Sequence, residues 1–256
     1  MTFAIVAHRG VHTELVENTL PAFERAIELG ADAVELDVRM TRDRVPVVYH
    51  YFYLEDRYSV PPLGGSASLA GTVFDHTWDQ LRRAQEAGGE PMRSRRIPLL
   101  REVLEGIGGR IGLEVEIKGP EPECVDVITG VLRDHRPLWE RMELTSYEPA
   151  LLLAMRERCP GLPTDLLLPR SESWMKLDVV THLAIHRARL ARARAVHLHP
   201  SQLSPQVATA IRSAGIELHA WDVNDEAALR LTAELEIPRI CTDRLAQALA
   251  FRQRAV

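Results

Sequence analysis

The chain is poor in lysine, in cysteine and in long apolar runs, and the last two shortages argue against a cysteine metal site and a membrane-spanning protein. Only two of its 31 basic residues are lysines, Lys118 and Lys176. Its three cysteines lack the spacing of a metal site, so we expect reduced packing residues and a cytoplasmic location. No apolar stretch approaches the ~20 residues that cross a bilayer, so we expect no stable membrane insertion.

The charge balance gives no sign of a nucleic-acid partner. A formal net charge of -5 provides no basic field for nucleic acid. The first residues, MTFAIVAHRG, have no basic segment before a short apolar run, so we expect no signal peptide. A length of 256 residues, 46% of them hydrophobic, suits one large α/β domain and leaves the oligomeric state open.

Short β-branched apolar runs alternate with segments of helical periodicity, which predicts a mostly parallel sheet. In the clearest helix the apolar residues of 20–29 share one face, Asn18 or Thr19 can cap it, and Gly30 ends it. If residues 46–50 (PVVYH) form a side hairpin, roughly eight strands remain, the number that closes a (β/α)8 TIM barrel. An open doubly wound sheet is the alternative, but it lacks its glycine-rich phosphate loop here.

One connection, residues 51–96, is much longer than the usual few residues. It contains the small-residue stretch PPLGGSASLAGT. Long loops at the C-terminal ends of barrel strands usually build or cover the active site. We therefore expect a single domain, residues 1–256, in which residues 51–96 are inserted after the second strand as a small cap over the barrel mouth.

Ionisable residues gather where the predicted strands end. In chain order they are His8, Arg9, Glu35, Asp37, His50, Glu116 and Lys118. Because the C-terminal ends of parallel barrel strands meet at one end of the barrel, we expect these side chains to form one site.

Glu35 and Asp37 lie two apart on a strand, so both point the same way, while their apolar neighbours point toward covering helices. Two carboxylates in a barrel mouth repel each other and need a cation, and oxygen ligands suit Mg2+ or Ca2+ rather than zinc. Glu116 on the next strand would supply a third carboxylate. Glu114, deeper on the same face, would pair with an arginine or widen the site. A solvated edge strand with outward acids is the alternative.

The other residues of the set suit phosphate chemistry. His8 and His50 would face one another across the metal, and two imidazoles can take and give protons near neutral pH. Arg9 offers a forked contact and Lys118 a point charge, and both fit phosphate oxygens. With a divalent cation, the set predicts cleavage of a phosphodiester.

Several of these segments resemble a known family. AHRG and ENTLPAFERAIELGADAVELDV resemble the signature of the glycerophosphodiester phosphodiesterase family. The similarity continues through VPVVYH, RIPLLREVLE, LEVEIK, IELHAWDVND and CTDR, so it covers nearly the whole chain. The resemblance implies a TIM barrel with a small insertion after the second strand, and hydrolysis of a small-molecule glycerophosphodiester to glycerol 3-phosphate and an alcohol.

The resemblance also implies a role for each residue of the set. One divalent cation, Mg2+ or Ca2+, would be bound by Glu35, Asp37 and Glu116. The general acid and base would be His8 and His50. The substrate would be bound by Arg9, Lys118 and Trp221. The first loop would be supported by Glu17, with Asn18 beside it.

This chain departs from the family pattern directly after His50, where Tyr51 stands in the place of the usual aspartate. An aspartate could orient the imidazole and raise its pKa, whereas tyrosine is not an anion at neutral pH. The aromatic residues beside His50 keep open a phospholipase D-like enzyme acting on lysophospholipids. The missing aspartate keeps open a non-catalytic barrel that binds phosphodiesters.

Three other patterns receive structural interpretations. HLAIH places His182 and His186 one helical turn apart without the glutamate of a metalloprotease, so we expect a helix surface. RARLARARA is expected to be a solvated helix face in a chain of acidic total charge. His199 ends a predicted strand, and we expect it to pack.

Overall fold

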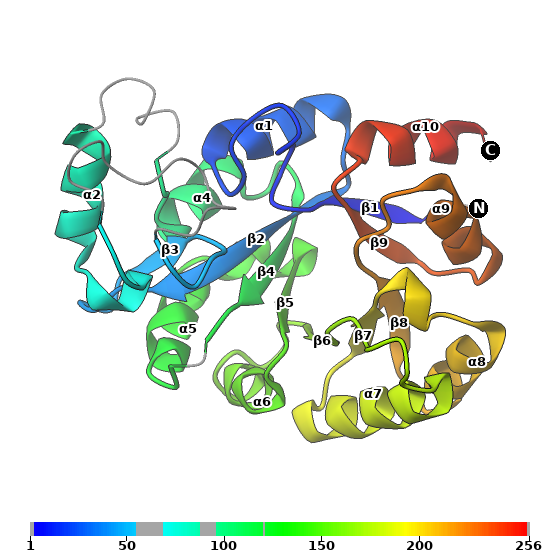
Figure 1. The fold of residues 1–256 in the computed structure, drawn as a ribbon. Helices are drawn as coiled ribbons and strands as arrows, with labels where there is room; N and C mark the ends of the chain where they lie inside the picture. The colour runs from blue at the N-terminus through cyan, green and yellow to red at the C-terminus, as the bar shows by residue number, and fades with distance from the viewer. Residues whose placement is uncertain (1–2, 55–68, 88–95, 120, 255–256) are drawn as a thin grey trace.

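The computed structural model describes residues 3–54, 69–87, 96–119 and 121–254. Within these ranges, eight parallel strands close into a barrel (Figure 1). They are β1 (Ala4–Ala7), β2 (Ala33–Met40), β4 (Gly112–Ile117), β5 (Met142–Ser146), β6 (Thr164–Leu167), β7 (Ala195–Leu198), β8 (Glu217–Ala220) and β9 (Arg239–Thr242). β1 pairs with both β2 and β9, which closes the ring and confirms the predicted TIM barrel.

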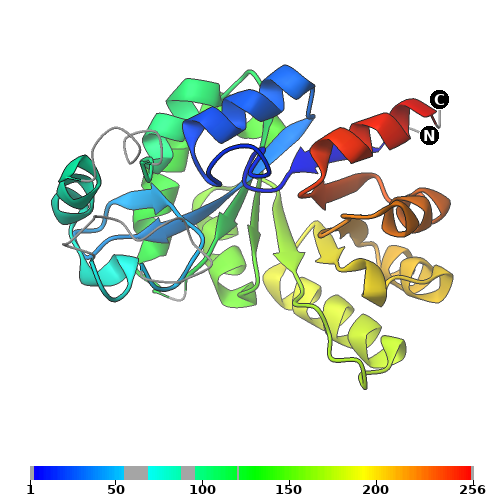
Figure 2. The same ribbon diagram turned by 45° about the horizontal axis from the view of Figure 1, so that its top comes forward.

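Helices alternate with the strands and surround them (Figure 2). They are α1 (Leu20–Leu29), α2 (Trp78–Ala87), α4 (Leu100–Ile107), α5 (Cys124–Asp134), α6 (Pro149–Arg158), α7 (Leu177–Ala191), α8 (Pro205–Ser213), α9 (Glu226–Glu234) and α10 (Leu245–Arg254). Short 3-10 helices are η1 (Val73–Asp75), η2 (Arg136–Arg141) and η3 (Pro200–Gln202).

Strand β3 (Pro46–Val48) lies outside the barrel and runs antiparallel to β2. Val38 of β2 is opposite Val48 in this pairing, so residues 46–48 form the side hairpin that the sequence predicts. The Tyr49 backbone N–H then donates to the Asp37 carbonyl oxygen at 2.9 Å. The hairpin therefore carries His50 back to the polar residues of β2.

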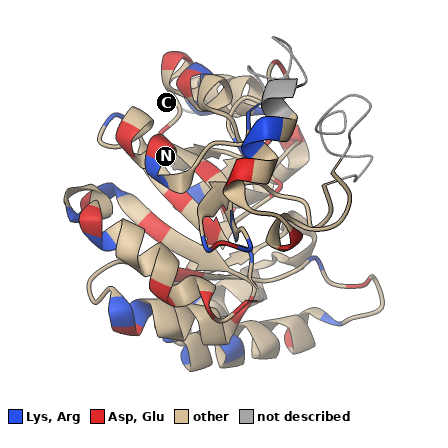
Figure 3. Cartoon of the chain, turned by 90° about the vertical axis from the view of Figure 1, so that its left-hand side faces the viewer, with Lys and Arg blue, Asp and Glu red and all other residues tan. Residues whose placement is uncertain are grey.

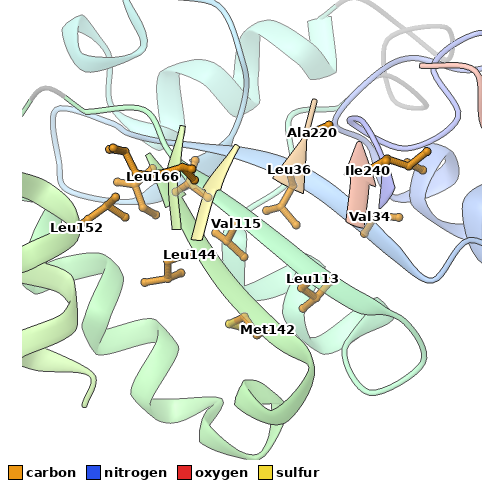
Figure 4. Close-up of a cluster of buried hydrophobic side chains, with 14 of the residues drawn as sticks. Val34, Leu36, Leu113, Val115, Met142, Leu144, Leu152, Leu166, Ala220 and Ile240 are labelled. Atoms are coloured by element: carbon orange, nitrogen blue, oxygen red, sulfur yellow. The ribbon is translucent and has the colours of Figure 1, made fainter. Parts of the chain in front are cut away.

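Strands β2 and β4 alternate apolar residues that face the helices with acidic residues that face inward. Val34 and Leu36 of β2 pack with Leu113 and Val115 of β4 in the main core (Figure 4). Strand residues two apart share a face, so the glutamates and aspartate between these apolar positions point to the barrel interior. This confirms the inward direction expected for the β2 carboxylates and excludes the solvated edge strand.

Helix α1 follows the predicted bounds. Gly30 takes a left-handed conformation (φ 86°), and its N–H bonds to the carbonyls of the last turn. Thr19 occupies the N-cap position, but its side chain donates to the Val16 carbonyl and makes no cap hydrogen bond. Asn18, the other predicted cap, turns its side chain to Asp37. Neither predicted cap therefore caps the helix backbone, and the Asn18 side chain contacts the carboxylate of Asp37 instead.

The β3 hairpin and residues 69–87 share a small hydrophobic core of their own. Val47, Leu54, Val73, Leu81 and Ile97 are buried in it. Residues 55–68 and 88–95 of the predicted insertion lie outside the described residues. That the segment caps the barrel mouth stays a prediction.

Acidic and basic residues are interspersed along the outer helices on the side that Figure 3 shows. Helix α7 carries His182 and His186 at exposed positions with their rings 6.3 Å apart, so the predicted helix surface is confirmed. Among the described helices, none combines the length and apolar character needed to span a bilayer. The absence of a nucleic-acid partner stays a prediction.

Candidate functional site

Three carboxylates from neighbouring strands meet inside the barrel. Glu35 and Asp37 come from β2, and Glu116 comes from β4, where it stands opposite Asp37. All three residues are buried, and one oxygen of each lies within 4.8 Å of the others. The structure thus brings together the three residues predicted as metal ligands.

Lys118 provides a positive charge to this group. Its Nζ atom lies 2.7 Å from Glu116 Oε1 and 3.1 Å from Asp37 Oδ1. Burial alone would raise the pKa of Asp37, but the charges of Lys118 and Arg9 hold it well below its usual range. Burial, and then the charge of Asp37, raise the pKa of Glu35 well above its usual value. Asp37 is therefore the firmly ionised member of the group, and Glu35 gains most from a further cation.

The loop after β1 brings two residues to Asp37. Arg9 and Asn18 both have left-handed backbone conformations, with φ of 53° and 56°. Arg9 Nε lies 3.1 Å from Asp37 Oδ2, and Arg9 Nη1 donates to Glu17 Oε2 at 3.1 Å. Asn18 Nδ2 donates to Asp37 Oδ2 at 2.7 Å, and Asn18 Oδ1 accepts from the Asp37 N–H at 3.2 Å. Glu17 thus contacts Arg9, where a loop-supporting residue would lie.

His8 stands between this acidic group and a second carboxylate. Its Nε2 atom lies 3.8 Å from Glu35 Oε2, and its Nδ1 atom lies 2.6 Å from Asp243 Oδ1. The same Asp243 oxygen is 2.8 Å from His12 Nε2, and Asp243 Oδ2 accepts from Asn224 Nδ2 at 2.7 Å. Burial would raise the pKa of Asp243, but the hydrogen bonds from His12 and His8 keep it below its usual range.

Asp243, His12 and Asn224 were not predicted as site residues. Asp243 directly follows β9, within the CTDR segment, and Asn224 lies in the segment after β8. Their positions after barrel strands were the signal that could have identified both. His12, in the loop after β1, shares this signal.

His50 follows β3 and lies beside the charged group. Its Nδ1 atom is buried and has no hydrogen-bond partner within the described ranges. Arg39 donates from Nε and Nη2 to the His50 carbonyl at 3.0 and 2.8 Å, which holds the backbone. The Tyr51 ring stands edge-on to the imidazole, with ring centres 4.8 Å apart. Burial lowers the pKa of His50 to about 3 although the charge of Asp37 opposes this, so the ring is neutral near pH 7.

Trp221, directly after β8, belongs to an aromatic group beside Lys118. Its ring centre lies 6.3 Å from that of Tyr147 and 5.7 Å from that of His199. Lys118 Nζ lies 5.9 Å from the centre of the Tyr147 ring. Trp221 Nε1 donates to the Leu168 carbonyl at 3.1 Å, which fixes the indole. His199 thus packs against the predicted substrate-binding tryptophan.

Glu114 stands opposite Glu35 in the pairing of β2 with β4, but its ion pairs are with other residues. Its Oε2 atom lies 3.6 Å from Arg239 Nε, and its Oε1 atom lies 3.6 Å from His197 Nδ1. The pairing with an arginine, one of the two outcomes expected from the sequence, is therefore the one observed.

The carboxylates of Glu35, Asp37 and Glu116 fit a hard divalent cation. Their donor atoms are all oxygen, the type that Mg2+ and Ca2+ prefer. Glu35 Oε1 is buried and finds no hydrogen-bond partner in the part of the chain that the structure describes. A buried acceptor without a partner costs free energy, and a cation between the carboxylates would remove that cost.

The fold is a closed (β/α)8 barrel. Its interior holds buried carboxylates, imidazoles and two cationic side chains, an arrangement typical of an enzyme that binds a divalent cation. The profile of the "Glycerophosphoryl diester phosphodiesterase family" matches residues 8–247. The chain belongs to this family of enzymes, as the sequence resemblance implied.

Two relatives of similar sequence carry the name of the same activity. The chain is 30% identical over 254 residues to "Glycerophosphodiester phosphodiesterase" of Caldanaerobacter subterraneus subsp. tengcongensis, covering 95% of each chain. It is 28% identical over 241 residues to "Glycerophosphodiester phosphodiesterase" of Bacillus subtilis, covering 87% of this chain and 77% of that protein.

Two solved structures show the same fold. A glycerophosphodiester phosphodiesterase from Thermotoga maritima superposes with a TM-score of 0.74 at 25% identity, covering 98% of this chain and 99% of that chain. A phosphodiesterase from Oleispira antarctica, in complex with the product sn-glycerol-3-phosphate, gives a TM-score of 0.76 at 23% identity and covers 96% of each chain.

Proposed function

We propose that the protein hydrolyses glycerophosphodiesters to glycerol 3-phosphate and an alcohol with the help of one divalent cation, Mg2+ or Ca2+. The observation that carries the proposal is the meeting of Glu35, Asp37 and Glu116 in one buried group that His8 adjoins. The activity named for the Caldanaerobacter relative and the sn-glycerol-3-phosphate bound by the Oleispira protein support the choice of substrate.

The cation would neutralise negative charge on the phosphoryl oxygens. Arg9 and Lys118 would place two further positive charges beside the same phosphoryl oxygens, although both side chains also contact Asp37. His50 would take a proton from the attacking water, and its imidazole is neutral near pH 7, as this role requires. His8, braced by Asp243, would give a proton to the departing alcohol.

A lysophospholipid substrate is the second candidate. The observation that favours it is the exposure of Phe52 and Tyr53, 46% and 51% exposed, two and three residues after His50. Turnover of glycerophosphocholine and of a lysophosphatidylcholine below its micelle concentration separates the two candidates. A strong preference for the lipid would overturn the first one.

The catalytic test is His50→Ala in protein supplied with Mg2+ or Ca2+. Turnover should fall by about 10²–10⁴-fold, the usual contribution of a general acid or base, while metal binding is retained. His186→Ala on the exposed face of α7 is the matched control. Retained turnover would remove His50 from the mechanism, and binding without any cleavage by the wild type would favour the non-catalytic barrel.

We also propose a cap over the barrel mouth and a cytoplasmic location. The insertion at residues 51–96 would cap the mouth beside His50, and its small core around Leu54 and Leu81 gives it internal support. A cytoplasmic location would suit Cys124, Cys159 and Cys241, which are buried and unpaired.

A further inference from the structure

A second group of ionisable side chains lies in the barrel interior, and the proposed function does not use it. Glu143, Asp165, His197 and His219 come from β5, β6, β7 and β8, which are consecutive in the ring. Each is at most 4% exposed. Barrel interiors are normally filled by apolar side chains, so four buried ionisable residues require a partner that stabilises them.

The inner atoms of three of these residues converge at distances that suit a metal ion. His197 Nε2 lies 3.1 Å from His219 Nδ1. Asp165 Oδ2 lies 3.4 Å from the first nitrogen and 3.7 Å from the second. Tetrahedral zinc with bonds of ~2.0–2.1 Å separates its ligand atoms by roughly 3.3 Å, which falls within this spread. Glu143 offers a fourth ligand atom within 4.8 Å of the others.

The second ring nitrogen of each imidazole, which points away from the other imidazole, faces a carboxylate. His197 Nδ1 is buried, lacks a hydrogen-bond partner in the described ranges, and lies 3.6 Å from Glu114 Oε1. His219 Nε2 lies 3.5 Å from Glu217 Oε2. A carboxylate beside the outer nitrogen favours the proton there, as at metal sites where the second ring nitrogen donates to a carboxylate. With the protons there, the two facing nitrogens would present lone pairs to the Asp165 oxygen, and a cation would join all three atoms, whereas a shared proton joins only the two nitrogens.

The charged groups around the four residues have both signs. The nearby carboxylates belong to Glu114, Glu143, Asp165 and Glu217, and the nearby guanidinium groups belong to Arg194 and Arg239. Burial raises the pKa of Glu114 well above its usual value, and the Glu217 side chain is 55% exposed, so Glu143 and Asp165 are the buried anions that the two arginines face. Protons on both facing ring nitrogens would repel each other across 3.1 Å.

The two arginines occupy some of the carboxylate lone pairs but leave others. Arg194 donates to both oxygens of Asp165, at 3.1 and 2.5 Å, and to Glu143 Oε2 at 2.5 Å. Arg239 Nε lies 2.6 Å from Glu143 Oε1. A carboxylate oxygen accepts along two lone-pair directions, so Asp165 Oδ2 can serve Arg194 and an ion together.

We propose that Glu143, Asp165, His197 and His219 bind one structural transition-metal ion, for which zinc is the best chemical fit. Two imidazole nitrogens distinguish this donor set from the all-oxygen group of Glu35, Asp37 and Glu116. Protein atoms fill all four positions, so the ion links β5 to β8 and leaves no open position for a substrate.

The test uses Co2+ and Zn2+ as probes on the full chain after removal of metal with a chelator. One equivalent of Co2+ should give the intense visible absorption of a tetrahedral site with nitrogen ligands. One equivalent of Zn2+ should displace it, and a large excess of Mg2+ should not. Wild-type protein without this absorption would overturn the proposal, whatever the variants do.

Variants then place the ion. His197→Gln and His219→Gln should each abolish the absorption. His12→Gln, which alters the neighbouring group of His8, His12 and Asp243, should keep it, and so should Glu35→Gln. Loss of the signal in His12→Gln with retention in His219→Gln would overturn the proposal. Because no hydrolysis is measured, the result is independent of the proposed function.

Discussion

His8 Nδ1 lies 2.6 Å from Asp243 Oδ1, although 235 positions separate the two residues in the chain. The contact joins the first barrel strand to the last and turns His8 Nε2 toward Glu35, 3.8 Å away. A carboxylate in this position selects the tautomer of an imidazole and stabilises its protonated form. Asp243 is therefore a positioning residue for the proposed proton donor.

Asp243→Asn should lower kcat by about 10²-fold or more and change KM little, because the amide keeps the shape but loses the charge. The measurement is steady-state hydrolysis of glycerophosphocholine with saturating metal. His12→Gln is the matched control, since it removes the other imidazole from the same Asp243 oxygen and leaves the His8 contact. Equal kcat values for Asp243→Asn and the wild type would show that the contact is only structural.

The sequence predicted the barrel and the acidic group because both depend on local patterns. A spacing of two residues places Glu35 and Asp37 on one face of a strand wherever that strand lies. Asp243 and His12 depend instead on closure of the ring between β1 and β9, a contact between distant segments that no local period encodes. The partners of Glu114 depend on strand register, which places it opposite Glu35 and within reach of Arg239.

Removal of the divalent cation should abolish turnover, because the positive charge proposed to neutralise the phosphoryl oxygens beside Glu35, Asp37 and Glu116 is then lost. We expect chelator-treated protein to regain activity on titration with Mg2+ or Ca2+. Glu116→Gln should require at least about tenfold more metal for half-maximal activity, since affinity depends on the number of charged ligands. Full turnover in the presence of excess chelator would contradict the metal-dependent reading.

Gly10→Ala should destabilise the fold through the loop that carries Arg9. Gly10 has φ 79°, and an added Cβ would lie 2.7 Å from the carbonyl carbon of Ala22. We expect a loss of about 2 kcal/mol or more in the free energy of unfolding, measured by urea denaturation. The control is Gly130→Ala in α5, where the new Cβ meets no atom within 4 Å beyond its chain neighbours and its own helix backbone, and a gain of about 0.5–1 kcal/mol is expected. Equal stabilities for Gly10→Ala and wild type would contradict the close approach.

Metal-free protein should lose stability in acid partly through His50. Burial lowers the pKa of this imidazole from 6.5 to about 3. Between pH 6.5 and pH 3, the imidazole is therefore protonated in the unfolded chain and neutral in the folded chain. Stability attributable to His50 is therefore complete above pH 6.5 and falls toward pH 3, by at most about 1.4 kcal/mol per pH unit.

His50→Gln should flatten this part of the stability profile, measured by urea denaturation at a series of pH values. His186→Gln on the surface of α7 should leave the profile as in the wild type. Parallel profiles for His50→Gln and wild type across this window would show that the buried imidazole does not couple to folding.

Tyr51→Asp should restore the anion that the family pattern places beside the imidazole of His50. The Tyr51 ring now meets His50 edge-on at 4.8 Å and contributes no charge. A carboxylate there favours the protonated imidazole, so the limb of the kcat/KM profile that reports His50 should move to higher pH by about one unit or more. Tyr51→Phe keeps an aromatic ring without the hydroxyl, and its limb should stay in place. If the profiles of Tyr51→Asp and Tyr51→Phe coincide, residue 51 does not tune the imidazole, and the departure from the family pattern at this position has no consequence for proton transfer.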